Sequence, residues 1–430
     1  MLDSDANSTL RKGLLDVASD LVLEIVPEQI VDIVPEHRPF RDVVRKFLKT
    51  NLPDSLRAAA IATPTVFAEP EIGREWQKIL YAQGWLAYNW PVEFGGTGWS
   101  AIERYIFERE CAFANAPGLP VLGLKLLASV LHAFGTPKQQ QHYLPKILSG
   151  EHYWCQGFSE TGAGSDLASL RTRAVKSGSF YCVNGAKIWT THAHFADHMF
   201  CLVRTDGTVK AQRGISFLLV DMKQPGVRVR PITTLAGDHE INEVFLDDVK
   251  VHEDDLVGAE GQGWSIAKFL LENERGGSCL APKLLADILR LRAHARIEPS
   301  GQESALIDDT LFACQLARME LEAQALEITE MRILDQLGQG RRPGPQTSIV
   351  KLVASELRRQ VDALSMSAFG YRGLELETRR PLYGPNSPSP IYSKEAQVAA
   401  PRYLNSQAWS IFGGSDEIQR NIIAKAVLMI

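Results

Sequence analysis

Two segments of the chain combine small residues, hydroxyls and aromatic rings in a way that could hold a planar ring. They are Trp154–Asp166 (WCQGFSETGAGSD) and Lys187–Thr191 (KIWTT). Hydroxyl and backbone groups can satisfy the polar edge of such a ring, and an indole can pack near its face. We therefore expect the two segments to form a pocket for a flat, polar ring such as a flavin.

The run Gly162-Ala163-Gly164-Ser165 could also belong to a dinucleotide-binding turn. A Rossmann fingerprint places a third glycine or alanine three positions after the second and continues as a helix. Leu167 occupies that position and strand-like sequence follows, which disfavours NAD binding of this type. A plain tight turn remains the alternative, since glycine supplies unusual backbone angles in any turn.

The composition excludes several other kinds of protein. A chain of 430 residues with a net charge of -5 and 45% hydrophobic residues can bury a large core. Lys and Arg form no basic run, so we expect no nucleic-acid partner. Charges interrupt the long apolar stretches and Met1–Asp5 lacks a basic region, so we expect neither a membrane span nor a secretory signal. Six isolated cysteines indicate reduced thiols and a cytoplasmic protein.

The hydrophobic periodicity changes twice along the chain. It is helical in residues 1–152, strand-like in 153–262 and helical again in 263–430, where one helix should end at Gly338. The order α, β, α predicts three domains with these boundaries. We assign no role to the first 35 or so residues.

The strand-like runs are short and closely spaced, which indicates a compact sheet or barrel. Asn184-Gly185 closes one of them and is a strong hairpin signal. Arg380–Ile391 contains four prolines and should be a loop. The expected strands are Leu170–Val175, Phe180–Val183, Met199–Val203, Ile215–Val220, Val227–Ile232 and Glu243–Val251.

Motifs spread over the whole chain resemble those of the acyl-CoA dehydrogenase family, in order, over about residues 38–430. Among the members of this family, the motifs are most similar in type to those of bacterial enzymes such as the large subunit of pimeloyl-CoA dehydrogenase and the steroid side-chain dehydrogenases. One departure is Thr161, where the family usually has proline. The matching stretches are Trp90–Gly98, Gln156–Asp166, Lys187–Thr191, Val203-Arg204 with Gly214–Ser216, Glu243–Phe245 with Asp248-Val249, Leu270–Arg275 and Phe412–Arg420.

This resemblance implies an α+β fold with an N-terminal helical domain, a central β-barrel-like domain and a C-terminal four-helix bundle. The cofactor it implies is FAD. Gln156, Phe158 and Ser159 would face the pyrimidine side of the flavin, Trp189 would stack near the ring and Thr191 would bond near N5. Ser165, beside Gly164 in the same turn, would contact the flavin phosphate or the CoA pantetheine, and Ser415 and Glu417 would lie at the adenosine. A serine and acids there would also cap a helix well.

The catalytic base departs from the commonest family pattern. Many members carry a carboxylate in the final loop, where this chain has Gly413, which can offer only its backbone N–H to the thioester carbonyl. A minority place the base on the first helix after the β domain, and the matching residue is Glu274. The neighbouring Glu272 and Arg275 are the expected substrate contacts. Alternatively, Glu274 is an ordinary helix residue that pairs with a neighbouring cation.

The family usually completes the FAD site with two motifs from a neighbouring subunit, and both are degraded here. Leu284–Ser304 offers Arg290, Arg292 and Arg296 but no Arg-x-x-Phe-Gly, and Ser365–Gly373 keeps only fragments of the glycine-rich turn. By resemblance we expect one subunit of a hetero-oligomer, with a homo-oligomer as the alternative.

The function implied by the resemblance is α,β-desaturation of an acyl-CoA, with hydride transfer to flavin N5 and electrons passed to an electron-transfer flavoprotein. A flavin monooxygenase or oxidase on the same fold is one alternative, which the absence of a glutamate at 413 would suit. A non-catalytic partner subunit is another. His192, His194 and His198 lack a fourth ligand at a convincing spacing, so we expect no metal and place them beside the flavin edge.

Overall fold

A computed structural model gives the fold and describes residues 35–276, 279–300, 304–341, 344–374, 376 and 394–429. The side chains of residues 273–276 and 394 are not part of that description. The expected loop Arg380–Ile391 and the first 34 residues lie outside the described residues as well.

Helices make up the part of the chain before the sheet. Ser100 and Glu103 form a capping box that begins α6, and Thr136 and Gln139 form another at α8, with Pro137 at the helix start as expected. The elements are η1 Pro35–His37, α3 Arg38–Asn51, α4 Asp54–Ala62, α5 Pro70–Gln83, η2 Val92–Phe94, α6 Ala101–Phe113, the π-helix η3 Leu122–Leu127, α7 Ala128–Phe134 and α8 Pro137–Ser149.

The middle of the chain forms one eight-stranded mixed sheet in the order β6-β7-β3-β2-β4-β5-β8, with β1 paired to β4 in parallel. Both faces of the central strands β4 and β5 are buried. Phe200 and Phe217 pack with the N-terminal helices and α9, whereas Met199 and Leu218 pack on the other face with apolar residues of β3 and β7. The strands are β1 Trp154–Gly157, β2 Arg173–Ser177, β3 Phe180–Thr191, β4 His198–Arg204, β5 Ile215–Asp221, β6 Val227–Ile232, β7 Ile241–His252 and β8 Leu256–Val257. Short 3-10 turns lie between them: η4 Leu167–Ser169, η5 Ala211–Gly214 and η6 Glu253–Asp255.

Two strand predictions were wrong in detail. Asn184-Gly185 is no hairpin turn but a register shift inside the continuous strand β3, where the Asn184 side chain binds Asp248 on β7 at 3.0 Å. The hairpin turn lies earlier, between the paired residues Ser177 and Phe180. Strand β2 begins at Arg173 rather than Leu170, because the amides of Arg171 and Thr172 bind the Glu160 carboxylate.

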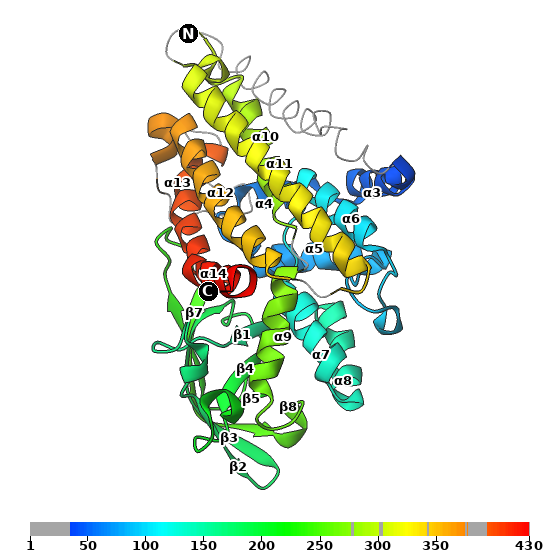
Figure 1. Cartoon of the computed structure of the whole chain (residues 1–430), viewed down its shortest axis with the longest axis vertical. Helices are drawn as coiled ribbons and strands as arrows, with labels where there is room; N and C mark the ends of the chain where they lie inside the picture. The colour runs from blue at the N-terminus through cyan, green and yellow to red at the C-terminus, as the bar shows by residue number, and fades with distance from the viewer. Residues whose placement is uncertain are drawn as a thin grey trace.

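The C-terminal part is helical, and Figure 1 shows α10, α11, α12 and α13 side by side, with α9 running between the sheet and α7. The helix expected to end at Gly338 does so, and Phe312, Leu316 and Leu326 lie on its buried face. The elements are α9 Gly263–Gly276, α10 Ala281–Ala295, η7 Leu306–Asp308, α11 Thr310–Gly338, α12 Gln346–Ala368, η8 Gly370–Leu374, α13 Lys394–Ser406, η9 Gln407–Ser410, α14 Asp416–Ile423 and the π-helix η10 Ala424–Leu428. The predicted α+β fold is confirmed.

No helix within the described ranges is long and apolar enough to cross a membrane.

Candidate functional site

The glycine-rich segment forms a tight turn between β1 and β2. Glu160 and Ala163 exchange backbone hydrogen bonds of 3.1 and 3.0 Å, which fold the turn back on itself. A Cβ added to Gly162 or Gly164 would meet no atom within 4 Å, so open space borders both glycines. The turn can therefore accept a ligand close to its backbone.

A buried ion pair fixes this turn against β3. Lys187 is 1% exposed, and its Nζ lies 2.8 Å from Glu160 Oε1 and 3.2 Å from the carbonyl oxygen of Phe158. Burial opposes ionisation of Glu160, but Lys187 and the amides of Arg171 and Thr172 outweigh it and hold the pKa of this carboxyl below its usual value. The sequence analysis missed this pair, although a lysine inside an apolar strand was a signal for it.

Trp189 is exposed on a strained part of β3. Its φ is +60°, its side chain is 57% exposed, and the strand register shifts between Lys187 and Thr190. A positive φ is costly for a bulky residue and is typical of functional positions. The bulge turns the indole outward, where it can meet a ligand rather than the core.

The polar side chains expected at the flavin have no hydrogen-bond partner among the described residues. No hydrogen bond joins the side chains of Gln156, Ser159, Ser165 or Thr191 to another described residue, although Ile188 donates its amide to the Ser159 carbonyl at 2.9 Å. Phe158, by contrast, is buried and packs edge-on against Phe200 and Phe217. The structure thus brings together the β1–β2 turn and the end of β3, with free polar groups available to a ligand.

The C-terminal loop before α14 carries the other expected positions. Gly413 has a φ of +67° and its carbonyl accepts from Gln419 Nε2 at 3.2 Å. Ser415 caps α14 by accepting the Ile418 amide, and the exposed Glu417 lies in its first turn, where bonds to the local backbone and to Ser415 lower the pKa of its carboxyl. Among the described residues, no hydrogen bond or ion pair joins Gly413, Ser415 or Glu417 to the end of β3.

Helix α9 carries the expected base. It packs against β5, α7 and the π-helix η3, and Gly263 lies so close to Ser216 that a Cβ there would be 2.6 Å from its carbonyl carbon. Glu274 lies in the last turn of α9, but its side chain and that of Arg275 fall outside the described residues. Glu272, on the same helix, is exposed.

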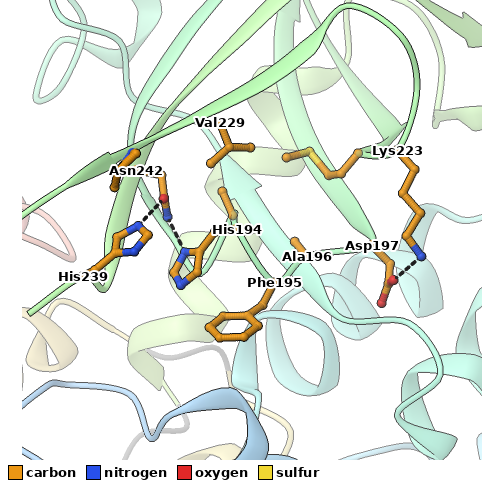
Figure 2. A pocket seen from close by; sticks show the side chains of 11 residues that line it. His194, Phe195, Ala196, Asp197, Lys223, Val229, His239 and Asn242 are labelled. Atoms are coloured by element: carbon orange, nitrogen blue, oxygen red, sulfur yellow. Dashed lines mark hydrogen bonds and ion pairs between the residues drawn. The ribbon is translucent and has the colours of Figure 1, made fainter.

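A cavity of about 400 Å³ opens just beyond the end of β3 (Figure 2). His239 donates to Asn242 Oδ1 at 2.7 Å, Asn242 Nδ2 donates to His194 at 3.0 Å, and the two imidazoles stack at 3.9 Å. Burial lowers the pKa of His194 to about 4, so it is neutral near pH 7. His192 instead bonds Tyr153, and His198 stacks on Trp154. Within the described ranges no group of His, Cys, Asp or Glu could hold a metal ion.

A buried carboxyl joins the three parts of the chain next to this cavity. Glu240 is 7% exposed, accepts the amide of Phe67 at 3.2 Å and is bonded by Asn405 of α13. Its backbone carbonyl accepts the amide of His192, directly after Thr191. Burial raises the pKa of Glu240 to about 7.

Two of the three arginines that could bind the FAD of a neighbouring subunit instead bind residues of this chain. Arg290 binds Asp287 and Asn115, and Arg292 binds Glu320. Arg296 is exposed at the end of α10.

Comparisons with known proteins follow the same three-part division. The chain matches the acyl-CoA dehydrogenase N-terminal domain over residues 34–151, the middle domain over 155–249 and the C-terminal domain over 261–428. It belongs to the acyl-CoA dehydrogenase family and is an oxidoreductase that uses FAD.

Relatives and solved structures agree over nearly the whole chain. The acyl-CoA dehydrogenase IpdE1 of Mycolicibacterium smegmatis is 37% identical over 406 residues, 91% of this chain and 97% of its own. The ChsE4–ChsE5 complex of Mycobacterium tuberculosis superposes with a TM-score of 0.76 at 30% identity, covering 92% of this chain and 98% of that one. The Tcur3481–Tcur3483 steroid acyl-CoA dehydrogenase gives 0.76 at 27% identity, covering 91% and 96%.

Proposed function

We propose that the chain is the catalytic subunit of an acyl-CoA dehydrogenase that introduces an α,β double bond into an acyl-CoA thioester. The observation that carries this proposal is the cluster at the end of β3. There an exposed, strained Trp189 and the unpaired hydroxyls of Ser159, Ser165 and Thr191 border the open turn. We also propose that the three domains end at residues 152, 262 and 430. The cofactor site would then lie in the middle domain and the catalytic base in the C-terminal domain.

The cluster fits FAD, because open space above glycines accompanies polar groups that have no partner among the described residues. Gln156, Phe158, Ser159 and Gly164 would hold the ring system, with Trp189 at its face and Thr191 at its N5 edge. Ser415 and Glu417 would hold the adenosine part. FAD, when bound, supplies the hydride acceptor for the substrate β-carbon.

Glu274 would take the α-proton as general base, because its place on the first helix after the β domain matches the base of family members that carry no carboxylate in the final loop. The Gly413 amide would donate to the thioester carbonyl and stabilise the charge that develops there. Glu272, Arg275 and Ser165 would contact the CoA thioester.

We further propose a cytoplasmic hetero-oligomer with a second acyl-CoA dehydrogenase-like subunit, with an electron-transfer flavoprotein as electron acceptor. The free cysteines fit a reducing compartment, and the internal pairing of Arg290 and Arg292 removes two candidates for binding a neighbour's FAD. A homo-oligomer is the competing arrangement.

The test is the visible spectrum of the chain purified alone, before and after anaerobic addition of mixed acyl-CoA thioesters. A flavin band that bleaches supports the dehydrogenase and contradicts the need for a partner. A colourless chain that gains a bleachable flavin with a second subunit supports both proposals. A bound flavin that no acyl-CoA bleaches, alone or with that subunit, contradicts the dehydrogenase.

A flavin oxidase or monooxygenase is the second candidate, because Gly413 offers no side-chain carboxylate in the final loop. Oxygen consumption without another electron acceptor would favour it over a dehydrogenase.

A further inference from the structure

The backbone at the end of β3 is left-handed at two places. Trp189 has a φ of +60° and His192 a φ of +54°, so these two residues enclose Thr190 and Thr191. Such angles persist in residues other than glycine where surrounding contacts hold them. The segment that carries the proposed contacts to the flavin face and to N5 is therefore held by other parts of the chain.

Asn242 of β7 supplies one of these contacts. It lies opposite Thr190 in the sheet and is fully buried, and its Nδ2 donates to the Thr190 carbonyl at 3.0 Å. Among the described residues, it is the one side chain that bonds the backbone of Thr190. The bonded carbonyl belongs to the planar peptide that joins Thr190 to Thr191. The Asn242 amide therefore sets the orientation in which the chain enters Thr191.

Two histidines fix the Asn242 amide from the side of the cavity (Figure 2). An asparagine amide has one acceptor oxygen and two donor hydrogens, and the carbonyl of Thr190 can only accept. Nδ2 lies 3.0 Å from Thr190 O and 3.0 Å from His194 Nδ1, and Oδ1 lies 2.7 Å from His239 Nε2. His239 therefore donates through Nε2 and His194 accepts through Nδ1, so a rotation of the amide would break three hydrogen bonds at once.

The histidines are accessible although the asparagine is not. His194 follows β3 and His239 precedes β7, their rings stack with centroids 3.9 Å apart, and both residues are exposed. A substitution of His239 can thus disturb the buried amide of Asn242 without opening a hole in the core.

The far end of the segment is held separately. His192 donates its amide to the Glu240 carbonyl at 2.9 Å, and its ring lies 2.8 Å from the Tyr153 hydroxyl. These contacts fix His192 and leave Asn242 to hold the peptide before Thr191.

We propose that Asn242, held by His239 and His194, is a positioning residue that sets Trp189 and Thr191 against the flavin ring. This rests on the proposed function, which places Trp189 and Thr191 at the ring. Asn242 acts through the Thr190–Thr191 peptide. Because a misplacement of about 1 Å can lower the rate of an enzyme about a hundred-fold, a small tilt of this peptide should be measurable.

The test replaces His239 in the FAD-loaded enzyme, in the assembly in which it is active. His239→Phe keeps a ring to stack on His194 but removes the donor to Asn242, whereas His239→Gln supplies a donor again. His252→Phe, at the other end of β7, is the matched control. Asn242→Asp places an acceptor against the Thr190 carbonyl and should have a larger effect than His239→Phe. If that variant does not fold, the two His239 variants decide.

Four quantities are measured: the visible flavin spectrum, the FAD dissociation constant, and kcat and KM with an acyl-CoA that the wild type oxidises. We expect His239→Phe to shift the flavin band, weaken FAD binding about five-fold and lower kcat about ten-fold, with KM within about two-fold of the wild type. His239→Gln should restore most of each loss, and His252→Phe should match the wild type throughout.

The spectrum and the FAD affinity need no substrate, so they separate the two proposals. A folded His239→Phe enzyme with the spectrum, FAD affinity and kcat of the wild type overturns the positioning role and leaves the dehydrogenase standing. Equal losses in His239→Phe and His239→Gln also overturn it, because the donor to Asn242 would then not matter. Spectral and affinity changes confined to His239→Phe, in an enzyme whose flavin no acyl-CoA bleaches, support the positioning role and contradict the dehydrogenase.

Discussion

Lys187 and Glu160 form a buried ion pair, 2.8 Å from Nζ to Oε1, that joins strand β3 to the glycine-rich turn after β1. The two segments that carry the cofactor candidates are thus held together by this pair and by the hydrogen bond from the Ile188 amide to the Ser159 carbonyl. Because Lys187 also binds the Phe158 carbonyl, the pair fixes the backbone on both sides of Ser159.

Lys187→Met should loosen this turn. It leaves the Glu160 carboxylate desolvated without its cation, which costs on the order of 3 kcal/mol of unfolding free energy. FAD should bind at least ten-fold more weakly, because Ser159 and Ser165 lose their fixed positions. Urea unfolding and flavin fluorescence titration measure the two effects.

A matched control for Lys187 is Lys223→Met. Lys223 pairs with Asp197 at 2.7 Å but is 73% exposed, so its loss should leave the urea unfolding midpoint almost unchanged. Equal effects of the two substitutions, or full FAD affinity in Lys187→Met, would contradict a positioning role for the buried pair.

Glu274→Gln should lower kcat by about a thousand-fold or more while the flavin spectrum is unchanged, because the amide cannot accept the α-proton. Lys268→Gln, on the same helix and exposed, is the control and should keep kcat within a few-fold. Rapid bleaching of the flavin by an acyl-CoA in the Glu274→Gln enzyme would remove this residue from the mechanism.

Trp189→Ala should separate ligand binding from folding. Trp189 is 57% exposed, so the loss of its indole should cost less than about 1 kcal/mol of stability. FAD affinity should fall about ten-fold, because an aromatic contact at the ring is lost. A large drop in the unfolding midpoint with unchanged FAD affinity would show that Trp189 serves packing instead.

The sequence predicted the architecture because hydrophobic periodicity and helix caps are local signals. The end of α11 at Gly338 and the strand periods in 153–262 both depend on neighbours in the chain. The prediction of a hairpin turn at Asn184-Gly185 was wrong because tertiary contacts override the local turn preference of these two residues. Asn184 binds Asp248 on β7, and Gly185 lies against Thr172, where a Cβ would be 2.5 Å from Oγ1.

The candidate site was predictable only in part, because some of its contacts join residues that are far apart in the sequence. Gln156, Ser159 and Trp189 stand in a motif, whereas the Lys187–Glu160 pair joins residues 27 apart and the Arg358–Asp287 pair joins α12 to α10. Nothing in the local spacing of Arg358 shows that it pairs with Asp287, 71 residues earlier. Such contacts follow from the packing of α10, α12 and α13 rather than from any one segment.

Glu240 should make stability depend on pH. Its pKa of about 7 lies above the ordinary 4.5, because burial raises it and Glu69 and Asp238 add to the effect. Between these pH values the folded protein retains a proton that the unfolded chain has released. Its contribution to stability is therefore complete below about pH 4.5 and is lost as the pH rises to about 7.

Glu240→Gln should remove that dependence, because the amide can still accept the Phe67 N–H but cannot ionise. Relative to the wild type, the variant should be more stable at pH 8 by about 2 to 3 kcal/mol, and the difference should close near pH 5. Urea unfolding midpoints at pH 5, 6, 7 and 8 measure this, with the exposed Glu75→Gln as control. A difference that stays constant with pH, or that grows as the pH falls, would mean that Glu240 is ionised in the folded protein and that its contacts with Phe67 and Asn405 stabilise the carboxylate.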